Sequence, residues 1–119
     1  MSQYRTRSDL VTEALESLGV LAAGQTPEIE DTTRVDEKIP AILADLAGRE
    51  IVYVADPDNI PEAWFSALAD IVAYECRIKF GVSQEAEVTL ANANQEAIAK
   101  LKVMLRGRPT YEPLRALYF

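Results

Sequence analysis

Carboxylates are the most plentiful side chains in this sequence that could do chemistry, and one cluster has the spacing of a metal site. The stretch Asp56-Pro57-Asp58-Asn59 starts as a calcium-binding loop does. Such a loop needs glycine at its sixth position and a bidentate glutamate at its twelfth, where this chain has Pro61 and Ala67. We therefore predict a turn that caps the following helix, and no metal site.

A second acidic cluster, Glu28-Ile29-Glu30-Asp31, precedes a predicted helix. The dipole of a helix favours negative charge at its N-terminus, so the cluster is typical of a helix start. Two carboxylates that the fold brings together could also act as an acid and base pair, as in glycoside hydrolysis. No spacing in the sequence selects such a pair.

The residue types that most other catalytic sites need are missing. The chain has no histidine, which excludes Ser-His and Cys-His nucleophiles, and neither GxxxxGK[ST] nor GxGxxG occurs. The single Cys76 excludes an intramolecular disulfide and a zinc cluster, and its apolar setting predicts a buried thiol. We predict that the protein is not an enzyme and has no cofactor.

The segment RPTYEPLRALYF, residues 108–119, is the strongest candidate for a functional element. The net charge of the whole chain is −7, but residues 100–119 hold five basic residues and only one acidic residue, Glu112. An acidic body with a basic, aromatic tail argues against wrapping DNA, because affinity for duplex comes largely from neutralised phosphates. So much apolar surface predicts that the tail lies against a partner protein or against its own subunit.

Apolar periodicity predicts four helices that position these residues, at about 8–18, 31–47, 61–80 and 84–105. We expect Thr6 or Ser8 to cap the first, Asp31 or Thr32 the second and Ser83 the fourth. The third helix has the broadest apolar stripe and should be central. The small residues of the fourth, 91–94, should form an outer face for close packing against a neighbour, or simply a solvated face.

Two features interrupt this pattern. Pro40 removes a backbone hydrogen bond, so we expect a kink there or two shorter helices that meet at Ile39. Residues 51–54 suit a short extended segment. Together these elements predict an all-α protein, a small four-helix bundle over residues 1–107 with an extended C-terminal tail over residues 108–119. No apolar run reaches bilayer length and the N-terminus is polar, which predicts synthesis in the cytoplasm and no membrane partner.

The series of elements resembles the head-to-tail connector proteins of tailed bacteriophages and gene transfer agents, also called adaptor or tail accessory factors. The likeness begins with TRSDLVTEALESLGV, residues 6–20, and continues through Ile42-Leu43-Ala44-Asp45-Leu46 and the segment at 51–54. It extends to the long helix opened by Ile60-Pro61 and closed by Phe80-Gly81, and covers the chain from about Thr6 to Leu105.

This resemblance implies a structural virion protein. Members of the family form a ring of twelve copies beneath the portal protein, extend the DNA channel, help to retain packaged DNA and present a platform for the stopper or tail protein. Duplex DNA passes through without sequence-specific binding. The implied location is the neck of the virion. We expect the isolated subunit to be a monomer. The alternative is a small cytoplasmic helical protein-binding module or regulator whose tail docks on a partner.

The resemblance also assigns portal-binding residues, because the C-terminal segment of the family leaves the bundle and inserts against the portal. The residues predicted to bind are Arg106, Arg108, Pro109, Tyr111, Pro113, Leu114, Arg115, Leu117, Tyr118 and Phe119.

Overall fold

The computed structural model describes residues 4–22 and 24–106, and this part of the chain is a small helical bundle, as predicted. Its helices are α1 (Arg7–Leu18), α2 (Ile29–Gly48), α3 (Glu62–Glu75) and α4 (Gln84–Arg106). Two short strands, β1 (Tyr4–Arg5) and β2 (Ile60–Pro61), pair antiparallel. Within these residues no helix is both long and apolar enough to cross a bilayer. The predicted tail, residues 108–119, lies outside the described residues.

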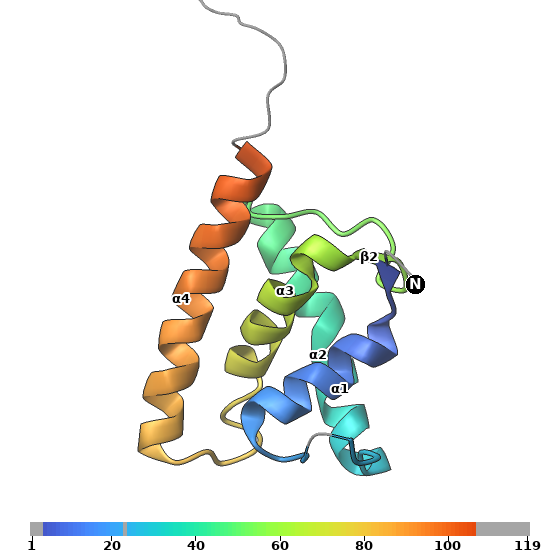
Figure 1. Cartoon of the computed structure of the whole chain (residues 1–119), viewed down its shortest axis with the longest axis vertical. Coiled ribbons are helices and arrows are strands. Elements are labelled where there is room, and N and C mark those ends of the chain that lie inside the picture. The colour runs from blue at the N-terminus through green and yellow to red at the C-terminus, as the bar shows by residue number, and fades with distance from the viewer. Residues whose placement is uncertain (1–3, 23, 107–119) are drawn as a thin grey trace, which may run out of the picture.

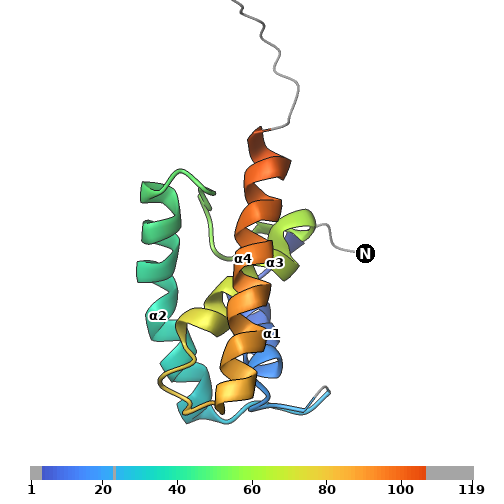
Figure 2. The ribbon, with the colours of Figure 1, turned by 90° about the vertical axis from the view of Figure 1, so that its left-hand side faces the viewer.

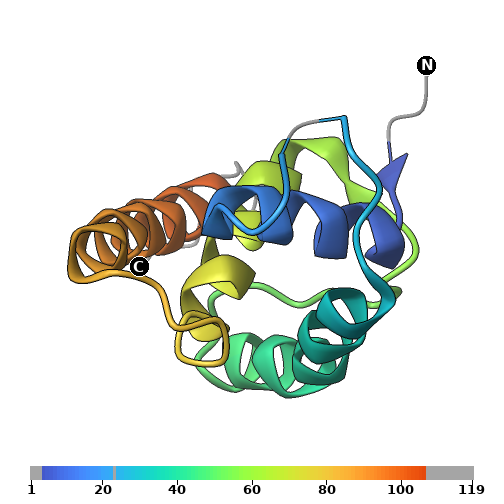
Figure 3. The ribbon, with the colours of Figure 1, turned by 90° about the horizontal axis from the view of Figure 1, so that it is seen from below.

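Helix α3 is the centre of the bundle. It lies between α4 on one side and the pair α1 and α2 on the other (Figures 1 and 3). Helices α2 and α4 run along the long axis, and α1 crosses that direction (Figures 1 and 2). Phe65, Leu68, Ile71 and Val72 of α3 are all buried, which confirms that its broad stripe is contacted on several sides.

Helix α1 begins and ends as its sequence predicts. The Thr6 hydroxyl accepts a hydrogen bond from the Asp9 amide over 3.1 Å, and the Asp9 carboxylate accepts one from the Thr6 amide over 3.2 Å. This reciprocal pair is a capping box, which satisfies two amides at the helix start. Gly19 ends the helix in a left-handed conformation with φ of 80°.

Helix α2 is one continuous helix, so the expectation of two helices that meet at Ile39 is wrong. The prediction that Asp31 or Thr32 caps it is also wrong. Glu28 is the N-cap and makes no capping hydrogen bond through its side chain, while Glu30 and Asp31 lie in the first turn. Their charge at the positive end of the dipole stabilises the helix start in place of a side-chain cap.

The third helix is shorter than predicted, because α3 ends at Glu75 and residues 76–81 form successive turns. The Lys79 amide donates to the Cys76 carbonyl over 3.1 Å, which is a bond of three-residue span. The apolar pattern continues to Phe80, but Ile78 is 78% exposed and so does not belong to the buried stripe. Because several residues of these turns are apolar, the periodicity of the sequence predicted a third helix that was too long.

The connection between α2 and α3 agrees with expectation only in part. Residues 51–54 belong to no helix or strand, and the buried Ile51 and Val52 of this loop cover the core. The predicted turn at Asp56 is present, since the Asn59 amide donates to the Asp56 carbonyl over 2.9 Å. The turn does not cap α3, because the N-cap of α3 is Pro61, which makes no capping hydrogen bond through its side chain. Asp58 in the turn instead accepts a hydrogen bond from the Arg7 amide of α1 over 3.3 Å.

Candidate interaction surface on the last helix

Helix α4 is the element that leads to the predicted binding residues. Its start is capped as predicted, because the Ser83 hydroxyl accepts a hydrogen bond from the Ala86 amide over 3.2 Å. Arg77 anchors this start to the end of α3: its Nε lies 2.9 Å from Glu87 Oε2, and its guanidinium carbon lies 3.8 Å from the centroid of the Tyr74 ring. The hydrogen bond to Glu87 is the main cause of a raised pKa at Arg77. The raised pKa reflects how directly the Glu87 carboxylate contacts the guanidinium.

One face of α4 packs against the bundle and another faces solvent. Leu90, Ala97 and Leu101 recur at helical spacing and are buried, mainly against α3. Val88 and Val103 are 57% and 71% exposed. Because Val103 comes near the end of the helix, its exposed apolar surface adjoins the point where residues 107–119 begin.

A shallow hollow of about 500 Å³ occupies this outer side of α4. Its lining is almost wholly apolar atoms, although two charged residues take part. We call it the α4 hollow, and its lining residues are Glu96, Ala99, Lys100, Val103 and Met104. An open apolar surface of this kind on a soluble chain is suited to contact with another polypeptide segment.

The α4 hollow has one charged side chain of each sign, Glu96 and Lys100. Asp70 of α3 is half-buried, and its burial raises the pKa of this carboxyl, while Lys100 lowers the pKa and Glu96 raises it. Asp70 is thus close enough to both Lys100 and Glu96 for each to shift its pKa. A segment with a charge of each sign could pair with Lys100 and Glu96 at this surface.

The predicted binding residues fall almost entirely beyond this surface. Arg106 is the last residue of α4, and the other nine, from Arg108 to Phe119, lie outside the described residues. The binding role of these nine residues stays a prediction, and the α4 hollow directly precedes them in the chain.

The small residues of α4 do not form one outer face. Asn92 is exposed, but Ala91, Ala93 and Asn94 are half-buried. The Asn94 side-chain oxygen is buried and has no hydrogen-bond partner among the described residues. Close packing on α4 therefore involves its own bundle at these positions.

The apolar pattern of the sequence does not show which residues at the edge of the buried stripe stay exposed, so the α4 hollow was not predicted. The signal that could have revealed it is the spacing of Ala99 and Val103, four residues apart and outside the stripe of Leu90, Ala97 and Leu101.

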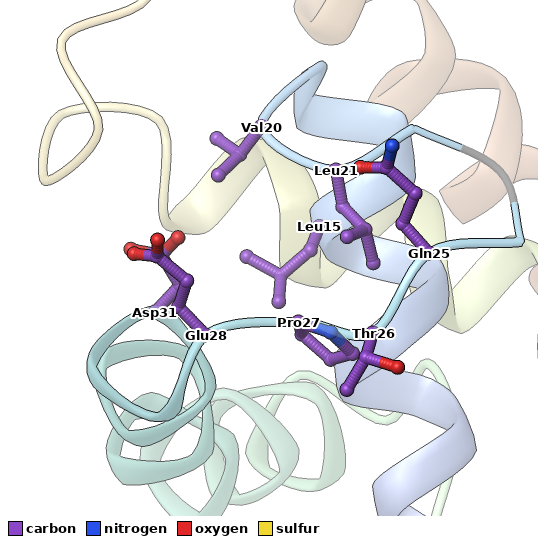
Figure 4. Close-up of a pocket in the computed structure, with 8 residues that line it drawn as sticks. All are labelled: Leu15, Val20, Leu21, Gln25, Thr26, Pro27, Glu28 and Asp31. Carbon is purple, nitrogen blue, oxygen red and sulfur yellow. The ribbon is translucent and has the colours of Figure 1, made fainter.

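The acidic cluster at the start of α2 borders a different pocket, of about 280 Å³, between the end of α1 and the start of α2. Leu15 and Leu21 lie on one side, and Glu28 and Asp31 on another (Figure 4). In the described part of the chain no group of three acidic or cysteine residues is placed to hold a metal ion.

Cys76 is fully buried as predicted, and burial raises the pKa of its thiol, which leaves it inert at neutral pH.

The fold and this surface define a class of protein: a small helical bundle with an exposed apolar face at the end of its last helix. Comparisons with protein families, with curated proteins and with solved structures found no match to this chain.

Proposed function

We propose that this chain is a structural, non-catalytic adaptor subunit in the head-to-tail connector of a tailed bacteriophage or a related gene transfer agent. Copies of it form a ring beneath the portal protein of a filled head. The ring extends the DNA channel, helps to retain the packaged genome and provides the platform for a stopper or tail protein. The site of action is the neck of the virion, after synthesis in the host cytoplasm.

The observation that carries this proposal is the order and spacing of the helices. Helices α1, α2 and α4 lie close to the predicted ranges, and α3 begins where Pro61 should open it. Helix α4 then continues to Arg106, from which the basic and aromatic tail follows directly. A bundle with a terminal binding segment is what the resemblance to the adaptor family requires.

The charge of the chain supports the same role. All acidic residues but Glu112 precede the tail, and the net charge is −7. A channel through which DNA must slide should not bind phosphates, and an acidic wall repels them. The basic residues Arg108 and Arg115 belong instead to the segment that would dock on protein.

In this proposal the tail docks on the portal, where Tyr111, Leu114, Leu117, Tyr118 and Phe119 supply apolar anchors. Aromatic and arginine side chains dominate the energetics of most interfaces. Pro109 and Pro113 limit the conformations of the free tail, so that less entropy is lost when it docks.

The proposal is tested by mixing the full chain with the portal protein encoded in the same genome and imaging the mixture by electron microscopy. We expect a ring of the chain on one face of the portal. Deletion of Pro109–Phe119 should reduce affinity for the portal by more than about a hundredfold, because the anchors are lost together. An unchanged affinity would show that the tail does not bind the portal.

A matched control keeps the length of the tail. Serine at Tyr111, Leu114, Leu117, Tyr118 and Phe119 should abolish binding, whereas glutamine at Arg108 and Arg115 should weaken it and reduce its salt dependence. Circular dichroism should give the same helix content for each variant, because the buried core precedes these positions. A monomer or dimer that never joins a portal ring would instead favour the small protein-binding module.

A further inference from the structure

The α4 hollow lies next to the point where the described chain stops. Val103 and Met104 are within the last turn of α4, and Glu96 is about 15 Å before Arg106 along the helix axis at 1.5 Å per residue. The hollow therefore occupies roughly the last three turns of the helix. A segment that leaves Arg106 and turns back along the outer side of α4 would lie over it.

The segment after α4 is long enough to turn back and cover this surface. Residues 107–119 can span on the order of 40 Å when extended, which is well over the length of the hollow. Gly107 permits a sharp change of direction, and Pro109 cannot continue the helix.

The chemistry of the segment matches that of the hollow. Ala99, Val103 and Met104 give an apolar floor, and Leu114 and Leu117 in the segment have the apolar side chains to cover it. Burial of such side chains contributes about 25 cal/mol for each Å² removed from water.

The charges also occur in complementary order. A segment that runs back along α4 meets Lys100 before Glu96, and in the segment Glu112 comes before Arg115. Glu112 therefore approaches Lys100 as Arg115 approaches Glu96.

We propose that in the isolated chain residues 108–119 fold back on α4 of the same molecule and cover the α4 hollow. This concerns the subunit before it meets any partner, and it holds whether or not the portal is that partner. A partner that binds the tail must first displace it from Glu96 and Lys100. The covered state keeps both apolar surfaces away from solvent and opposes premature self-association.

Disulfide cross-linking in the full chain tests this proposal. The test pair is Asn92→Cys with Ala116→Cys. Asn92 is exposed and lies one turn before Glu96, and Ala116 follows Arg115 in the sequence. The control pair is Lys102→Cys with Ala116→Cys, because Lys102 is also exposed but is not part of the hollow. The native Cys76 is fully buried and does not compete.

A tail that is not docked should react faster with position 102, by about twofold, because the loop to be closed is shorter. A docked tail should reverse this order, so that the 92–116 disulfide forms at least about threefold faster than the 102–116 disulfide. Intramolecular products are separated from dimers by non-reducing electrophoresis. A faster 102–116 reaction overturns the proposal, and so does a disulfide-linked dimer, which would place the tail on a second copy.

Charge reversal tests the pairing itself. Glu96→Lys or Arg115→Glu alone should slow 92–116 cross-linking by about threefold, which corresponds to one exposed ion pair. The two reversals together should restore the original rate. Failure of the double reversal to restore the rate would overturn this alignment of tail and helix.

Discussion

Arg7 donates a hydrogen bond from Nη2 to the main-chain oxygen of Asp36 over 2.9 Å. In a regular helix this oxygen accepts from the amide four residues later, but that residue is Pro40, which has no N–H. The Arg7 Nε also lies 2.6 Å from Asp36 Oδ1. Arg7 of α1 therefore supplies the donor that Pro40 removes, and it fastens α1 to the middle of α2.

This contact predicts that the effect of Arg7 depends on Pro40. Arg7→Ala should lower the free energy of unfolding by about 1–2 kcal/mol, since a carbonyl and a carboxylate lose their donor. In a Pro40→Ala background the amide of residue 40 satisfies the Asp36 oxygen, so the same change should cost about 0.5–1 kcal/mol less. Urea unfolding of the four proteins measures the coupling. Equal losses in the two backgrounds would mean that Arg7 acts through the carboxylate alone.

Truncation of a side chain on the buried side of α4 should lower stability much more than truncation of a side chain on its exposed side. Leu101 is 0% exposed, so Leu101→Ala should destabilise the fold by about 2–5 kcal/mol through a cavity against α3. Val103→Ala removes a side chain on the outer surface and should change stability by less than about 0.5 kcal/mol in a chain that lacks residues 108–119, in which no tail can cover it. Thermal unfolding compares the pair. A large loss from Val103→Ala would place this residue in the core of the bundle.

The backbone just after α2 is strained at Glu50, and a substitution there should relieve the strain. Glu50 has φ of 58°, and the Ile51 amide donates to the Leu46 carbonyl over 2.9 Å, which is the C-terminal motif that usually has glycine at the left-handed position. Glu50→Gly should stabilise the fold by about 0.5–1 kcal/mol, because glycine tolerates this conformation.

A second change at the same helix end supplies a comparison. Gly48 is helical and a Cβ there would meet open space, so Gly48→Ala should stabilise by a similar amount, about 0.5–1 kcal/mol. Glu50→Ala should give little gain, since it keeps the strained φ. Chemical denaturation distinguishes these variants, and equal gains from Glu50→Gly and Glu50→Ala would argue against strain.

The carboxyl of Asp70 should make stability depend on pH. Burial raises its pKa above the ordinary value of 3.8, so the folded state disfavours the ionised form. Its favourable contribution is complete below the unfolded pKa and is lost as pH rises through the folded pKa. Asp70→Asn should therefore be more stable than the wild type at pH 7, and the difference should shrink as the pH falls through the folded pKa and be smallest below pH 3.8.

The matched control is Glu37→Gln, which removes an exposed carboxylate from α2. It should show no comparable difference between neutral and acid pH. A stability gain from Asp70→Asn that persists unchanged at low pH would mean that the amide forms a new contact and that ionisation is not the cause.

Local chemistry explains which elements could be predicted. Thr6, Gly19 and Ser83 mark helix ends through hydrogen bonds and backbone conformations that involve only neighbouring residues. The end of α3 could not be placed this way, because Ile78 is apolar in the sequence but its exposure depends on how the turn reaches α4. The surface on α4 likewise required knowledge of which face α3 covers.

From the sequence alone one could predict four helices, a central third helix, a buried cysteine and a charge split between an acidic body and a basic tail. These follow from periodicity, capping and composition, which are properties of short stretches. The tertiary structure was needed to show that Arg7 replaces the donor missing at Pro40, and that Asp70 of α3 lies close to Lys100 of α4. Arg7 and Asp36, like Asp70 and Lys100, are distant in the chain, and side-chain packing brings them together because no local rule links such positions.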